Sequence, residues 1–400
     1  MFALLASAAG LKAKDNFQNL RLVWTTTPQT HATISWESDM KTEGDYLILW
    51  EEGNEPLRIS ATSTKAYTPS QGKEKKGKKK KKDEEASVDE EPWYYRHVRI
   101  QGLMPSTVYH LTAHSDGQES AQFHFRTAPN DDRNFKLIYV GDSRSNIDVA
   151  ETISTQLGEM AAKDPEILAA IHGGDFASRG TVSHWRPWLA AWERTTSENG
   201  RLLPIIPVVG NHEDISRSPV YSEAYDMPGG NENFLYSCKL APNFRIAVLN
   251  SEIPSTGVQE SFLKETLERY KSEKVRWQLV AFHRPVYPAV KKPGMLQRLV
   301  PHFESYNIDL VLESDGHCIK RTVPIRNNEQ DPSGVVYLGE GGYGAPQRDP
   351  KDLWYLEAPG FASKGDHLML LRVTPEKIEY KTIGMNASVL DQFDFFPRKR

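Results

Sequence analysis

The stretch "FKLIYVGDSR", residues 135–144, marks the point where the pattern of the chain changes. An apolar run with strand propensity leads into Gly141 and Asp142, so a buried strand is expected to end in a turn that carries a carboxylate. From residue 134 onward, similar runs alternate with amphipathic segments, which is typical of an α/β domain. This stretch therefore predicts the fold class of the larger part of the chain.

The expected strands of the α/β domain are short and apolar. They are "FKLIYV" (135–140), "EILAAIH" (166–172), "PIIPVV" (204–209), "FRIAVLN" (244–250), "WQLVAFH" (277–283), "IDLVLES" (308–314) and "GVVYLG" (334–339). Apolar residues at helical spacing predict helices around 147–162, 181–196, 258–272 and 294–306. We expect the domain to span 134–385, followed by a tail over 386–400 that either packs as a last strand or extends away.

The amino-terminal part has the pattern of an all-β sandwich over residues 19–130. Short alternating runs such as "HATISWES" (31–38) and "VYHLTAHS" (108–115) are separated by turn residues. Tyr109 follows a Pro-Ser-Thr turn, as the tyrosine corner of such a sandwich does, and the segment resembles a fibronectin type III domain. A charged insertion, 70–92, sets a lysine block against an acidic block. We expect a disordered loop there, with docking to an anionic partner as the alternative.

Composition excludes some partners and leaves other questions open. The 49 basic and 53 acidic residues give a net charge of −4, so no specific nucleic-acid partner is indicated. No stretch approaches the roughly 18 apolar residues of a transmembrane helix. Residues 1–18 form an N-terminal segment that resembles a remnant signal but lacks a basic start. Secreted, periplasmic and cytoplasmic locations stay open, as do the oligomeric state and a bridge between Cys238 and Cys318.

Ligand-type side chains follow five of the expected strands. In open α/β sheets, the crevice beyond the carboxyl ends of the strands is where ligands bind, so these side chains are expected to converge. Each one alone also has an ordinary structural explanation, as a turn residue or a packing histidine. The residues are Asp142, Asp175, Asn211 with His212, His283, and Asp315 with His317.

The mixture of carboxylate, amide oxygen and imidazole suits Fe, Mn or Zn, with Mg as a further candidate. The order of the motifs, "GDSR", "GGDF", "GNHED", a single His before "RP", and a last Gly-His-x-His-like segment, is similar to the calcineurin-like metallophosphoesterase superfamily. Together with the fibronectin-like domain, the chain resembles the purple acid phosphatase branch. That resemblance implies a four-layer αββα domain holding two metal ions.

The resemblance also implies a role for each matching residue. Asp142 and His317 would hold the first ion, Asp175 would bridge both, and Asn211 and His283 would hold the second. His212 would contact the scissile phosphate and protonate the leaving oxygen, the alternative being a structural histidine. Positive charge near the ions is expected from Arg144 and Arg179, since guanidinium groups suit phosphate oxygens; each is equally compatible with a surface or salt-bridge role.

Two positions depart from the family pattern. Ser178 stands where purple enzymes have a tyrosine, which predicts a centre without colour. Asp315 stands where the first histidine of Gly-His-x-His belongs, and we expect this carboxylate to bind the second ion. A rival alignment starts the motif at Gly316-His317 and leaves Ile319 in the place of a ligand. Cys318 is a further, soft candidate, but its side chain is expected to point away from its neighbour's.

These observations predict a metal-dependent hydrolase of phosphoric esters. The leading hypothesis is a phosphomonoesterase in which a dinuclear centre supplies a metal-bound hydroxide and His212 assists the leaving group. A phosphodiesterase acting on nucleotide or lipid-type diesters is the alternative within the same chemistry. A non-catalytic binding protein on the same scaffold is the alternative from another class.

Overall fold

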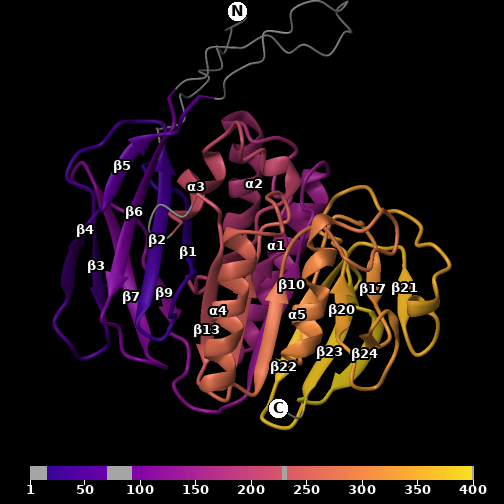
Figure 1. The fold of residues 1–400 in the computed structure, drawn as a ribbon. Coiled ribbons are helices and arrows are strands. Elements are labelled where there is room, and N and C mark those ends of the chain that lie inside the picture. The colour runs from indigo at the N-terminus through magenta and orange to yellow at the C-terminus, as the bar shows by residue number, and fades with distance from the viewer. Residues whose placement is uncertain (1–15, 70–91, 228–231, 399–400) are drawn as a thin grey trace, which may run out of the picture.

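The computed structural model describes residues 16–69, 92–227 and 232–398. Its amino-terminal part is a β-sandwich, drawn from indigo to purple at the left of Figure 1. One face consists of strands β1 (Gln18–Val23), β2 (His31–Ser38), β6 (Tyr94–Gln101) and β5 (Ser63–Ala66). The other consists of β4 (Leu57–Ser60), β3 (Tyr46–Trp50), β7 (Val108–Ser115) and β8 (Gln118–Glu119), with β9 (Phe123–Arg126) paired to β7.

The sandwich contains the expected tyrosine corner. The hydroxyl oxygen of Tyr109, on β7, accepts a hydrogen bond of 2.9 Å from the backbone N–H of Met104. The Tyr109 ring is buried and stacks on Phe125. This contact ties the turn before β7 to the strand, as expected for this kind of sandwich.

The second part consists of two sheets that carry helices on their outer faces. The first sheet has the order β24-β23-β22-β10-β11-β12-β1-β2-β6-β5, and the second has the order β13-β14-β15-β16-β20-β17-β21. Strands of the first are β10 (Phe135–Val140), β11 (Ile167–His172), β12 (Ile205–Pro207), β22 (His367–Val373), β23 (Ile378–Gly384) and β24 (Val389–Phe395). Strands of the second are β13 (Tyr236–Ala241), β14 (Phe244–Val248), β15 (Trp277–Ala281), β16 (Leu310–Leu312), β17 (Ile319–Arg321), β20 (Val336–Gly339) and β21 (Phe361–Ser363).

The two parts of the chain share a sheet, which the sequence did not suggest. Strand β1 pairs antiparallel with β2 of the sandwich and parallel with β12 of the α/β domain, through the pair Val23 and Ile205. The backbone N–H of Trp24 donates to Ile205 O at 2.9 Å. A buried ion pair of Arg21 with Glu37 lies beside this seam, and Arg21 also donates to the carbonyl of Ala224. The sandwich is therefore fixed to the α/β domain by backbone pairing.

Helices form the outer layers. They are α1 (Ile147–Lys163), α2 (Val182–Glu193), α3 (Val220–Tyr225), α4 (Val258–Ser272) and α5 (Val300–Ser305). Alternate residues of β14, β15 and β16 separate the two hydrophobic clusters: Ile246, Leu279 and Leu310 face the first sheet, whereas their neighbours Ala247, Val280 and Val311 pack with Leu263 and Leu267 of α4. Side chains alternate between the two faces of each strand, so one face packs against the helices outside and the other against the second sheet inside. This is the expected αββα order.

The structure confirms one of the two alternatives for the tail, a last strand. β24 pairs antiparallel with β23 along its length and forms the edge of the first sheet. Arg321 on β17 holds β24 through two hydrogen bonds of 2.8 Å to Asp391. This buried pair helps to hold β24 in the fold.

The structure also bears on the expected helix over 294–306, on the two cysteines and on membrane-spanning helices. The expected helix over 294–306 is a short 3₁₀ segment, Met295–Leu299, continued by α5. Cys238 and Cys318 are both free and buried. Among the described residues, no helix is long and apolar enough to cross a membrane. The signal-like segment falls largely on residues 1–15 and the charged insertion on 70–91, which lie outside the described residues.

Candidate metal centre

The five motifs come together where the parallel strands end. Asp142 follows β10 and Asp175 follows β11, while Asn211 begins a 3₁₀ turn after β12; all three belong to the first sheet. His283 follows β15 and Asp315 follows β16 in the second sheet. The carboxyl ends of strands from both sheets therefore form one site, as expected for an α/β crevice.

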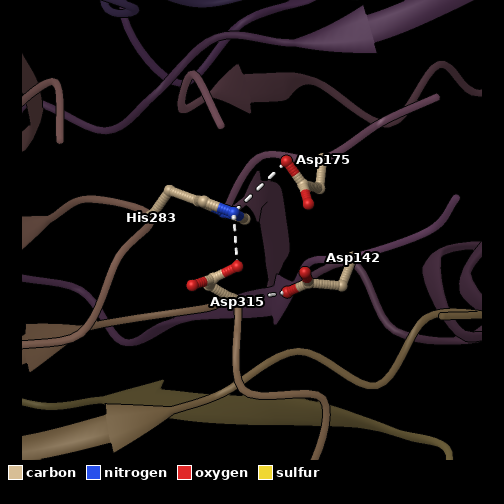
Figure 2. Close-up of side chains that lie close together, drawn as sticks. All are labelled: Asp142, Asp175, His283 and Asp315. Carbon is tan, nitrogen blue, oxygen red and sulfur yellow. Dashed lines mark hydrogen bonds and ion pairs between the residues drawn. The ribbon is translucent and has the colours of Figure 1, made fainter. Parts of the chain in front are cut away.

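Four of these side chains form a buried cluster, shown in Figure 2. Ligand atoms of Asp142, Asp175, His283 and Asp315 all lie within 4.8 Å of one another. Nε2 of His283 lies 3.2 Å from Asp175 Oδ1 and 3.6 Å from Asp315 Oδ1. The backbone N–H of Asp315 donates to Asp142 Oδ2 at 2.9 Å. His317 adjoins the cluster, with its Nε2 at 3.2 Å from Asp142 Oδ1.

The backbone at the cluster is in an unusual conformation. Asp142, Asp175, Asp315 and His317 have φ values of 58°, 57°, 68° and 61°, in the left-handed region. Such positions are uncommon for residues with a side chain and persist where the surroundings fix them. Here they turn the chain sharply after each strand, so that the side chain points into the crevice.

Buried Glu213 fixes the turn at Asp175 and the turn that follows β12. Its carboxylate accepts backbone hydrogen bonds from Gly210 at 2.6 Å and from Asp175 and Phe176 at 2.9 Å each. Burial and the nearby carboxylate of Asp175 raise the pKa of Glu213 to about 8. Our sequence reasoning did not assign this residue a role, although its place in "GNHE" was a usable signal.

The three histidines share one arrangement. Each Nδ1 lies within hydrogen-bond distance of a backbone carbonyl: His212 of Ser178 at 2.7 Å, His283 of Gly173 at 2.8 Å, and His317 of Pro346 at 3.0 Å. A proton on Nδ1 satisfies the carbonyl and leaves Nε2 facing the site. This is the arrangement that orients imidazole as a metal ligand.

Cationic side chains surround the carboxylates. Arg144 donates from Nε to Asp175 Oδ2 at 3.0 Å, and Nη2 lies 3.3 Å from His317 Nε2. Lys291, which had no signal in the sequence, donates from Nζ to Asp315 Oδ1. Nη1 of Arg284 lies 3.9 Å from Asp315 Oδ2. Arg179 is exposed, and within the described part of the chain no hydrogen bond joins it to the cluster.

These contacts set the ionisation of the cluster. Burial raises the pKa of Asp315, but the His283 imidazole and the Lys291 ammonium beside it outweigh this effect and lower the pKa to about 2. Burial likewise opposes ionisation of Asp175, yet His283 and His212 hold its pKa well below the usual range. Burial lowers the pKa of His283, and the carboxylates of Asp175 and Asp315 reverse this and raise it well above its ordinary value. Both aspartates are therefore carboxylates at neutral pH.

The donor set fits a metal ion. Asp142 Oδ1, Asn211 Oδ1 and His283 Nε2 are buried without a hydrogen-bond partner. A buried polar atom without a partner carries a desolvation cost of about 1–3 kcal/mol, and these three belong to residues predicted as ligands. Oxygen and imidazole nitrogen donors together suit first-row divalent ions.

The structure also places the residues at which the sequence departs from the family. Asp315 lies in the cluster, whereas Ile319 is on β17 in the hydrophobic core. Cys318 packs in the second hydrophobic cluster, and burial raises the pKa of its thiol. Ser178 contributes its carbonyl to His212. Asp315, among the alternatives considered, is the residue whose side chain reaches His283.

Comparison with known proteins agrees with this architecture. Residues 17–127 match the family described as purple acid phosphatase, N-terminal domain, and residues 135–318 match the calcineurin-like phosphoesterases. Purple acid phosphatase 15 of Arabidopsis thaliana is 24% identical over 66% of this chain and 56% of its own length. Acid phosphatase type 7 of Homo sapiens is 25% identical over 64% of this chain and 65% of its own length.

Solved structures share the fold. A purple acid phosphatase from yellow lupin seeds superimposes with a TM-score of 0.77 at 17% identity, covering 95% of this chain and 74% of that chain. The chain spans less than two thirds of the curated relatives it matches, 56% of purple acid phosphatase 15 and 62% of purple acid phosphatase 23 of Arabidopsis thaliana. Residues 135–318 are therefore a calcineurin-like phosphoesterase domain, and residues 17–127 are the amino-terminal domain found in purple acid phosphatases.

Proposed function

We propose that the chain is a metal-dependent phosphatase that hydrolyses phosphoric monoesters. The observation that carries the proposal is the set of buried donor atoms without partners, on Asp142, Asn211 and His283, at the meeting point of the strand ends. The names of the relatives support the same reaction class, since purple acid phosphatase 15 and acid phosphatase type 7 are both phosphatases by name.

The candidates to hold metal are the six residues predicted from the sequence: Asp142, Asp175, Asn211, His283, Asp315 and His317. Four of them, Asp142, Asp175, His283 and Asp315, form the compact cluster. A bound divalent ion would polarise a phosphoryl oxygen and lower the pKa of water near it. Fe, Mn and Zn suit the mixed donors, and the third carboxylate, Asp315, favours Mn or Mg over Zn. Ser178 offers no phenolate, so we expect a colourless centre.

His212 is placed to move a proton. Its backbone N–H donates to Asp175 Oδ1 at 2.9 Å, which fixes the residue beside the cluster. Its Nδ1 is held by the Ser178 carbonyl, while Nε2 lies 3.8 Å from Asp175 Oδ2. The side chain is 30% exposed, so a substrate can reach it. In the imidazolium form, Nε2 would give its proton to the leaving alkoxide as the P–O bond breaks.

Arginine side chains would bind the phosphate group. Arg144 presents a guanidinium at the cluster itself, and Arg179 extends from the loop after Asp175. A guanidinium matches the spacing of two phosphate oxygens and stays charged at every physiological pH. Arg144 has the stronger support, because its side chain already contacts Asp175 and His317.

Turnover of matched substrates tests the proposal. We expect the protein, stripped with chelator and reloaded separately with Mn, Zn, Fe or Mg, to hydrolyse nitrophenyl phosphate faster than bis-nitrophenyl phosphate. Preference for the diester would assign the chain to phosphodiesterases on the same centre. Absence of turnover of both substrates with every metal would contradict the proposal and favour a binding role.

A further inference from the structure

Arg144 contacts two residues that the family pattern assigns to the first metal ion. Two residues assigned to that ion, Asp175 and His317, are both contacted by its guanidinium: Nε donates to Asp175 Oδ2 at 3.0 Å, and Nη2 lies 3.3 Å from His317 Nε2. Because Nδ1 of His317 is held by the Pro346 carbonyl, Nε2 is the nitrogen available to a cation. The guanidinium is therefore hydrogen-bonded to the lone pair on His317 Nε2 that a metal ion would need as its ligand.

Two further contacts position Arg144. Nη1 donates to Ser145 Oγ at 3.2 Å, and the backbone N–H of Arg144 donates to the carbonyl of Asp175 at 3.3 Å. The side chain is only 13% exposed. An arginine cannot lose its charge in a protein, so the cation at this position is permanent.

Four of the remaining donors have the dimensions of a site for one ion. Ligand atoms of Asp142, Asp175, His283 and Asp315 all lie within 4.8 Å of one another. Two ligands on opposite sides of one ion, each about 2.1 Å away, lie roughly 4.2 Å apart. Two ions separated by roughly 3.5–4 Å need outer ligands that are farther apart than this.

The charges of the cluster also favour a single metal ion. The cluster contains three carboxylates, Asp142, Asp175 and Asp315, all buried. One divalent ion together with the Arg144 guanidinium balances these three charges, and the Lys291 ammonium at Asp315 already brings the sum to one positive charge. A second divalent ion would raise this excess to three positive charges beside the guanidinium, which is costly in a medium of low polarity.

We propose that this chain holds a single metal ion, and that the guanidinium of Arg144 takes the place of the first ion of the family's dinuclear centre. This inference rests on the proposed metal-dependent function and deepens it. The ion is held by Asp142, Asp175, His283 and Asp315, with Asn211 beside them. Arg144 would bind the substrate phosphate beside the ion, and His317 would position the guanidinium and would not bind metal.

The stoichiometry of bound metal tests the inference. The whole chain is saturated with Mn, freed of excess by gel filtration, and measured for Mn per chain, with electron paramagnetic resonance to detect coupling between ions. We expect one Mn per chain with the spectrum of an isolated ion. Arg144→Gly is expected to raise the content to two and to give an exchange-coupled spectrum. The matched control Arg179→Ala, which removes an exposed arginine near the same cluster, is expected to stay at one.

His317→Ala provides a second, independent arm in case Arg144→Gly does not fold, as judged by circular dichroism. If His317 is not a ligand, the variant keeps one Mn; in a two-ion centre it loses one. Two Mn in the unmodified chain, or an unchanged content in folded Arg144→Gly, would overturn the inference and leave the proposed phosphatase function standing. No bound Mn in any form of the protein would contradict both.

Discussion

Lys320 is the buried charge whose removal tests the structural account most sharply. It lies on β17 with no exposed surface, between the carboxylates of Glu313 and Glu340, and its ammonium lies 2.7 Å from Glu340 Oε1. Glu340 also accepts from the backbone N–H of Ala289 at 2.8 Å, and its carbonyl accepts from the N–H of His317 at 2.7 Å. The triad thus lies directly beneath the loop that carries Asp315 and His317.

Lys320→Met keeps the length of the side chain and removes its charge. Two buried carboxylates then face each other without a cation, and removing one partner of a buried pair costs about 3–5 kcal/mol. For a domain of this size, each kcal/mol shifts the midpoint of thermal unfolding by about 2–4 °C, so we expect a decrease of roughly 6–20 °C.

The loss should depend on pH. Burial raises the pKa of Glu340 to about 7 even though Lys320 opposes this, and without Lys320 the pKa rises further. A carboxyl whose folded pKa exceeds its unfolded value contributes stability below the unfolded pKa, and that contribution is lost as pH rises through the folded pKa. The destabilisation should therefore be larger at pH 8 than at pH 5.

Thermal unfolding followed by circular dichroism, in chelator to remove any effect of bound metal, measures the change. The matched control is Lys364→Met, which removes a lysine from an exposed pair with Asp349 at 3.4 Å. That control should change stability by no more than about 0.5 kcal/mol. A decrease for Lys320→Met as small as for the control would refute the reasoning that the buried triad stabilises the site loop.

Three further changes give distinct outcomes. Asp315→His should shift metal preference from Mn toward Zn with the fold intact, because imidazole is the softer ligand; unchanged metal content and activity would show that Asp315 is not a ligand. His212→Ala should lower kcat by roughly 100- to 10,000-fold, with a larger loss for phenyl phosphate than for nitrophenyl phosphate; equal losses would argue against proton donation. Burial lowers the pKa of His97 from 6.5 to about 4, so stability should fall by about 3 kcal/mol between pH 6.5 and pH 4, measured by urea unfolding. His97→Gln should remove that pH dependence, and a slope equal to that of the unmodified protein would contradict the assignment.

The sequence predicts the strand ends well because each motif follows an apolar run. Asp142, Asp175 and His283 could be placed from the position of polar residues directly after buried strands, and the structure brings them together. Tyr109 was likewise predictable from its turn. These are local signals, in which the residue type and its neighbours along the chain carry the information.

Contacts between distant segments could not be predicted in this way. The pairing of β1 with β12 joins Val23 and Ile205 through backbone atoms alone, so no side-chain pattern in the sequence predicts it. Lys291 is one of two adjacent lysines in a loop, and only the folded chain brings it to Asp315. The tail was ambiguous because β24 is held largely by strand pairing and by the Arg321–Asp391 pair.

Dependence of phosphomonoester hydrolysis on bound metal tests the central claim most directly. Nitrophenyl phosphate turnover is measured on the unmodified chain, after removal of metal by chelator, and after stepwise return of Mn, with Mn content determined on the same samples. We expect turnover to vanish with the metal and to return in proportion to the Mn bound. Asp175→Asn is expected to bind less Mn and to stay inactive. Turnover that persists in the metal-free protein, or its absence at full Mn occupancy, would contradict the account.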